Sequence, residues 1–139
     1  MVIQRIQSVY LFISAVLMAV YSFLDVALVQ NLTGALEKLS LFNASAISFI
    51  LSILVAVLSL VTIFKYKQLN YQIGLCIVNC ILIVTQLVVL VVELMSQEFN
   101  SVELFICNCM PIVSLIFMIL SISAIRRDKK LLSSYDRLR

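Results

Sequence analysis

The uncharged apolar stretch at residues 72–93 constrains the fold more than any other part of the chain. Between its polar ends lie twenty residues without a charge, and fourteen of them are Leu, Ile or Val. About 20 apolar residues, at roughly 1.5 Å each in a helix, match the roughly 30 Å hydrocarbon core of a bilayer. The stretch therefore predicts a transmembrane helix. Its few amides predict partner helices, because polar side chains avoid lipid.

Composition extends this prediction to the whole chain. Hydrophobic residues make up 63% of the 139 residues and charged residues only 12%, whereas soluble domains are about 25% charged. Two glycines and one proline leave little room for linkers, so we expect a single domain over residues 1–139. The expected fold class is all-α, in an integral membrane protein.

Four apolar stretches predict four transmembrane helices, at about residues 8–29, 44–64, 73–95 and 102–125. The first is longer than the apolar part of a signal peptide and lacks a clear Ala-x-Ala site, so we expect it to remain as a helix. Pro111 predicts a kink within the fourth helix. Small residues gather on one face of the second helix, which favours close packing against a neighbour: Ser45, Ser48, Ser52, Ala56 and Ser59.

The longest polar connection, residues 30–43, lies between the first two predicted helices. Its leucines Leu32, Leu36 and Leu39 have helical spacing. We therefore expect part of this connection to form a short helix on the membrane interface.

Charge determines the predicted orientation. Four spans place the N-terminus, the second connection and the C-terminal tail on one side, and nine of the ten Lys and Arg residues fall there. The exception is Lys38. The positive-inside rule counts Lys and Arg in short connections like these. It therefore predicts an antiparallel four-helix bundle with both termini in the cytoplasm.

The basic tail at residues 126–139 has its apolar residues on one helical face, so we expect it to continue as a helix along the membrane surface. Its cations suit anionic lipid headgroups, at about 1 kcal/mol for each cation near the surface. Two acids interrupt the tail, which argues against nucleic acid as a partner.

Polar residues recur at every seventh position of the central stretch and form a stripe on the predicted helix: Gln72, Asn79, Gln86 and Glu93. With Asn108 at the outer end of the fourth helix, the stripe is a candidate lining for a polar path or a small pocket. The alternative, which we prefer, is hydrogen bonding between helices, because no ionisable group lies at mid-membrane.

Asp25 is the one acid inside an apolar stretch. If the first helix ends near Asp25, its carboxylate reaches water. If the helix continues to Val29, Asp25 is a candidate cation or proton site, because an acid in lipid must pair or bind a proton.

The four cysteines do not predict a metal site. Cys76 and Cys80 differ in expected depth from Cys107 and Cys109 by at least roughly 10 Å, too far for one tetrahedral centre. The chain has no histidine, and no nucleophile with a base, glycine-rich phosphate loop or pair of carboxylates is recognisable. We expect no enzyme, no cofactor and no metal.

Both ends of the sequence carry a family resemblance. The chain opens with Ile3-Gln4-Arg5-Ile6-Gln7 and Tyr10-Leu11, and it closes with Ala124-Ile125-Arg126-Arg127-Asp128, Leu131, Ser134 and Asp136-Arg137-Leu138-Arg139. These residues resemble the ends of a bacterial family of small four-span membrane proteins, domain of unknown function 4293. The resemblance implies a bacterial inner-membrane location and brings no activity or cofactor. It directs interest to six residues at the cytoplasmic face: Gln4, Arg5, Gln7, Asp128, Asp136 and Arg137.

These patterns favour a non-enzymatic accessory or scaffold protein whose cytoplasmic ends contact lipid or a membrane protein partner. The candidate contacts are those six residues together with Arg126 and Arg127. The alternative is a small homo-oligomeric transporter or channel, in which Asp25 or the polar stripe faces the pathway.

Overall fold

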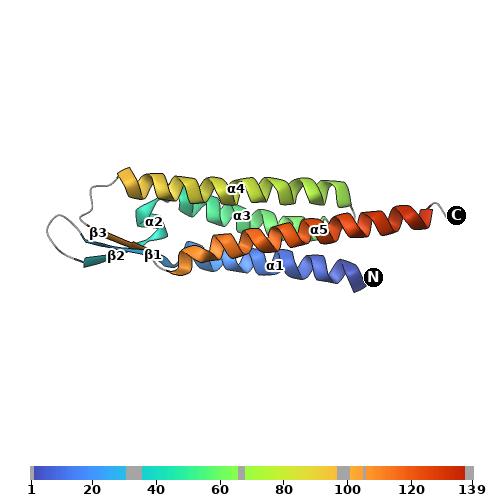
Figure 1. Ribbon diagram of the computed structural model, residues 1–139, viewed down its shortest axis with the longest axis horizontal. Coiled ribbons are helices and arrows are strands. Elements are labelled where there is room, and N and C mark those ends of the chain that lie inside the picture. Colours follow the sequence, from blue (N-terminus) through green and yellow to red (C-terminus); the bar gives the residue numbers. More distant parts are fainter. Residues whose placement is uncertain (1, 31–35, 66–67, 97–100, 105, 137–139) are drawn as a thin grey trace.

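Long helices dominate the structure. The computed structural model describes residues 2–30, 36–65, 68–96, 101–104 and 106–136. Its long helices are α1 (Val2–Ser22), α3 (Ala46–Phe64), α4 (Leu69–Ser96) and α5 (Met110–Asp136). They run side by side, with the start of α1 and the end of α5 at the same end of the molecule (Figure 1). Helix α1 packs against α3 and α5, and α4 packs against the same two helices, so the four form a closed ring.

Three of the helical segments are long and apolar enough to cross a membrane: Ala46–Phe64, Leu69–Ser96 and Ile106–Leu131. The apolar part of α1, Ile6–Ser22, is shorter. Large apolar side chains on the outer faces of the helices are exposed, among them Phe12, Ile50 and Ile81. A surface of this kind, on helices of this length, is typical of a protein surrounded by lipid.

A small antiparallel sheet covers the end of the molecule opposite the termini (Figure 1). Strand β1 (Asp25–Gln30) lies at its centre, between β2 (Leu36–Ser40) and β3 (Ser101–Leu104). Only helices were expected from the sequence, whereas the structure is mainly helical and also contains this sheet. The sheet joins the connection after α1 to the connection before α5.

Helix α1 ends at Ser22, and the predicted continuation to residue 29 is wrong. The hydroxyl of Ser22 donates to the carbonyl of Ala19 at 2.7 Å. The N–H groups of Phe23 and Leu24 donate to the carbonyls three residues earlier, at 3.1 and 3.2 Å. Such short-range bonds tighten the last turn of a helix and satisfy its free carbonyls. Asp25 therefore lies outside the helix, at the start of β1.

The connection predicted to carry an interfacial helix also differs. Leu36 and Leu39 belong to strand β2, where pairing with β1 outweighs their helical spacing; Leu32 lies outside the described residues. A single helical turn, α2 (Leu41–Ala44), follows the strand. Ser45 then caps α3, because its side chain accepts a hydrogen bond from the N–H of Ser48 at 3.0 Å.

The last helix begins later than residue 102. Strand β3 and the 3₁₀ turn η1 (Ile106–Cys109) precede it, so Pro111 lies in the first turn of α5. A proline there removes an N–H that has no partner within the helix, and it does not require a kink. The tail is helical to Asp136, but it continues α5 without interruption and is not a separate surface helix.

Two apolar clusters form the core. The larger joins the four long helices around residues such as Met18, Val55, Ile83 and Met118. The smaller lies beneath the sheet and contains Tyr21, Val26, Leu41, Ala44 and Leu90. The sheet is thus packed on the helices by apolar contact.

Asn108 adds directional bonds to this packing. Its Nδ2 donates to the carbonyl of Val26 at 2.8 Å, and its Oδ1 accepts from the hydroxyl of Tyr21 at 3.1 Å. Next to it, the thiol of Cys107 donates to the carbonyl of Asp25 at 2.8 Å. One side chain on η1 therefore fastens β1 to the end of α1.

Replacing Asn108 should destabilise the protein. Asn108→Ala leaves the Val26 carbonyl and the Tyr21 hydroxyl without these partners, so we expect a loss of about 1–3 kcal/mol in the free energy of unfolding. The measurement is thermal unfolding of the purified protein in detergent. Asn43→Ala, at an exposed position on α2, is the matched control. Equal effects of the two variants would contradict the role assigned to Asn108.

Candidate functional site

The polar stripe faces the interior of the helix ring. Gln72, Asn79 and Gln86 are each no more than 1% exposed, and Glu93 at the end of α4 is half-buried. Seven residues are close to two turns of a helix, so side chains with this spacing share one face. The three amides therefore lie among the packed helices, as the preferred interpretation of the stripe requires.

The stripe meets the small-residue face of α3, which is buried as predicted. The Nδ2 of Asn79 donates to the hydroxyl of Ser59 at 3.4 Å. The hydroxyl of Ser48 lies 3.5 Å from the backbone carbonyl of Gln86, a long hydrogen bond. Contacts of this length position two helices but contribute little energy each.

Most of the capacity of these amides for hydrogen bonding is unused. Gln72 Oε1, Asn79 Oδ1 and both amide atoms of Gln86 have no partner in the part of the chain that the structure describes. Buried polar atoms are usually paired with protein or ordered water. The stripe can therefore accept additional polar partners.

Serines extend the polar interior to the other two helices. The hydroxyls of Ser14 on α1 and Ser114 on α5 are hydrogen-bonded at 2.7 Å, and both residues are completely buried. Ser121, about two helical turns further along α5, is also buried. All four long helices thus contribute polar groups to one interior.

A buried polar contact closes this interior at the end where the chain begins and finishes. Gln7 on α1 is 2% exposed and Asp128 on α5 is 6% exposed. The Nε2 of Gln7 donates a hydrogen bond to Oδ2 of Asp128. The resemblance drew attention to both residues separately, and the structure brings them together across the length of the chain.

The remaining predicted contact residues fall into three groups. Arg126 and Arg127 lie on α5 with exposed side chains. Gln4, Arg5 and Asp136 lie within helices of which only the backbone is described there, and Arg137 lies outside the described residues.

The structure gives Asn108 and Asp25 partners outside the stripe. Asn108 bonds to Val26 and Tyr21 beneath the sheet. Asp25 starts β1 opposite Ser40. The residues predicted as one polar group therefore separate into the interior stripe and the sheet attachment.

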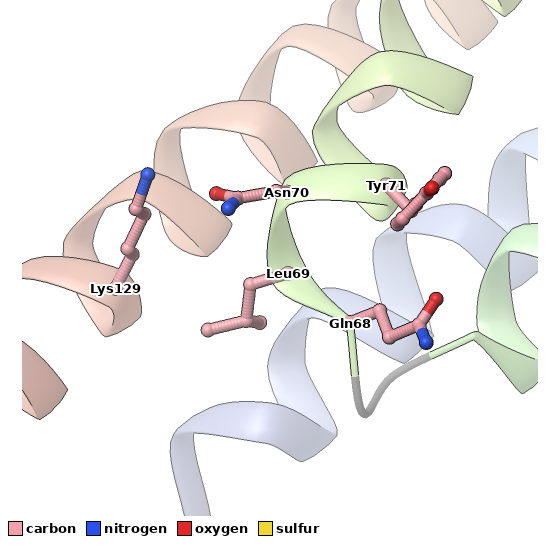
Figure 2. A pocket seen from close by; sticks show the side chains of 5 residues that line it. All are labelled: Gln68, Leu69, Asn70, Tyr71 and Lys129. Atoms are coloured by element: carbon pink, nitrogen blue, oxygen red, sulfur yellow. The ribbon is translucent and has the colours of Figure 1, made fainter.

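A pocket of about 420 Å³ lies where α4 begins beside the last turns of α5. Its lining residues are Gln68, Leu69, Asn70, Tyr71 and Lys129. Figure 2 shows the Asn70 amide extending from α4 towards α5, where Lys129 lies. From the sequence, Lys129 was expected only as part of the basic tail. The polar residues before α4 did not predict a pocket, because polar residues precede many apolar helices.

Comparison with protein families agrees with the resemblance. The model of the family described as Domain of unknown function (DUF4293) matches residues 3–138. The chain belongs to this family. No curated protein and no solved structure matches the chain. The DUF4293 match covers Gln7 and Asp128 alike, so the contact between them lies within the family domain.

The bond between Gln7 and Asp128 predicts an energetic coupling. Gln7→Leu and Asp128→Leu each leave a buried polar partner unpaired, whereas the double variant removes both partners. We expect a coupling of about 1–3 kcal/mol in a double-mutant cycle measured by unfolding in detergent. The same cycle between Gln7 and the exposed Lys130 is the control and should give none. Additive losses from Gln7 and Asp128 would mean that their bond does not stabilise the fold.

Proposed function

We propose that this DUF4293 protein is a four-span accessory or scaffold protein of the bacterial inner membrane, without enzymatic activity. Its task is to hold the cytoplasmic end of α5 in position for a membrane protein partner. The observation that carries the proposal is the unbroken course of α5 from an apolar segment into a basic one, fixed to α1 by the buried Gln7–Asp128 bond.

The membrane orientation rests on length and charge. The apolar part of α1, Ile6–Ser22, is near the lower limit of about 17 residues for a membrane-spanning helix. Helix α1 is therefore long enough to join the three longer segments as a span. Exposed cations lie on the last turns of α5, whereas Glu37 and Glu103 lie on the sheet at the other end. The positive-inside rule then assigns both termini to the cytoplasm.

The end of α5 suits a docking role. The helix extends beyond the ends of its neighbours (Figure 1) and exposes Arg126, Arg127, Lys129 and Lys130. Because the helix is continuous with a packed span, these cations are held on a rigid element. Rigid presentation lowers the entropy lost on binding and so favours a stable contact.

Affinity purification tests this proposal. With a tag at the C-terminus and gentle solubilisation of native membranes, mass spectrometry should detect a stoichiometric protein partner. Arg126→Ala with Arg127→Ala should reduce its recovery at least about tenfold, since charged anchors at interfaces are often worth more than about 1.4 kcal/mol. Lys38→Ala, on the sheet at the opposite end, should leave recovery unchanged. Isolation of the protein alone, as a defined homo-oligomer, would overturn the proposal.

One observation favours a second candidate, a small homo-oligomeric transporter or channel. Gln72, Asn79 and Gln86 are buried inside the helix ring, and each has at least one amide atom without a partner among the described residues. Buried polar groups in a membrane commonly mark a substrate or ion path. Under this candidate the interior around Gln86 is hydrated, and under the accessory function it is dry.

Cysteine accessibility distinguishes the two. In a variant without the four native cysteines, Gln86→Cys should react with a charged maleimide about as slowly as Val88→Cys, which faces outward on the same helix. The reason is that a charged reagent enters neither a dry interior nor lipid. Labelling of Gln86→Cys at least about tenfold faster than Val88→Cys would instead support a hydrated path.

A further inference from the structure

We infer that the pocket between α4 and α5 binds one anionic phospholipid, with its phosphate beside Lys129 and an acyl chain along Gly74. The inference rests on the membrane orientation proposed above and adds a ligand and its binding site. It depends on two adjoining cavities: a cation and two amides line the first, and mainly apolar atoms line the second.

The headgroup end is the pocket of about 420 Å³ shown in Figure 2. Lys129 and Asn70 approach it from different helices, and both carry N–H donors. Lys129 forms no ion pair with any residue that the structure describes, so its charge is available to a ligand. No acid is among the described residues that line either cavity, so these donors favour an anion, and a phosphate accepts from several of them at once.

The acyl end is a second cavity of about 330 Å³, lined by Asn70, Tyr71, Gly74 and Leu75. It shares Asn70 and Tyr71 with the first cavity, so the two adjoin. Gly74 lies four residues beyond Asn70, or about 6 Å further along the helix. The absent side chain leaves space there, since a Cβ at Gly74 would meet no atom within 4 Å. The path therefore runs from a cation at the end of the span to an apolar surface within it.

This arrangement matches an anionic phospholipid better than a free anion or a neutral lipid. A free phosphate would use the donors but not the groove. A phosphatidylcholine carries the same phosphate but would also bring its choline cation close to Lys129. The aromatic ring of Tyr71, which is 71% exposed, lies between the cavities, at the depth where tyrosines meet lipid headgroups.

Native mass spectrometry of the full-length protein in detergent tests the inference. We titrate short-chain phosphatidylglycerol, phosphatidylcholine with the same chains, and glycerol 3-phosphate. The wild-type protein should bind phosphatidylglycerol at least about fivefold more tightly than phosphatidylcholine, as expected for one cation near a headgroup. Lys129→Ala should abolish this preference. Lys130→Ala, exposed on the same turn but outside the pocket, should retain it.

Gly74→Leu tests the acyl groove separately. The new side chain enters open space, so the fold should remain intact by thermal unfolding, while binding of both lipids weakens at least about fivefold. Three results would overturn the inference: equal losses from Lys129→Ala and Lys130→Ala, unchanged binding in Gly74→Leu, or glycerol 3-phosphate binding as tightly as phosphatidylglycerol. Co-purification of the protein partner with the Lys129→Ala variant is scored in parallel. A lost lipid preference with a retained partner separates this inference from the accessory function.

Discussion

The buried face of α4 is the surface on which the helices of this protein depend. Between apolar helices in lipid, burial of hydrocarbon gives little driving force, so close packing and hydrogen bonds decide which faces meet. Here the buried amides of α4 share an interior with a serine-rich face of α3, and Asn79 bonds to Ser59 on that face. Rotation of α4 would bring the amides to the lipid-facing surface. The rotation of this helix, and with it the position of its neighbours α3 and α5, follows from that constraint.

The same interior limits which motions the protein can make. The sheet connects the loop after α1 to the loop before α5 at one end of the molecule. The Gln7–Asp128 bond connects α1 to α5 at the other end, near the termini. A rocking motion that separates α1 from α5, as helices separate in many transporters, would break bonds at one of these ends. A scaffold has no such requirement, and a ring that is fastened at both ends suits it.

The existence of the long helices could be predicted from the sequence far better than the residues at which they end. The length of the run in α4, the stripe of amides and the small residues of α3 follow from local spacing, and the structure confirms their burial. Strand β1 was missed because Val26 to Val29 continue the apolar run of α1 without a glycine or proline between them. Its strand character comes from partners distant in the chain. The Gln7–Asp128 contact was out of reach for the same reason, although each residue was singled out. The pocket at Lys129 forms between α4 and α5. The charge pattern drew attention to the end of α5 but not to the start of α4.

The place of β3 in the sequence sets an order of assembly. Strand β1 pairs with β2 soon after both are made, but its other edge pairs with β3, which comes immediately before the last helix. Until then β1 presents unpaired backbone groups, as any edge strand does. A chain interrupted after α4 therefore lacks the partner for this edge of β1. Completion of the sheet requires that the segment between α4 and α5 has been synthesised.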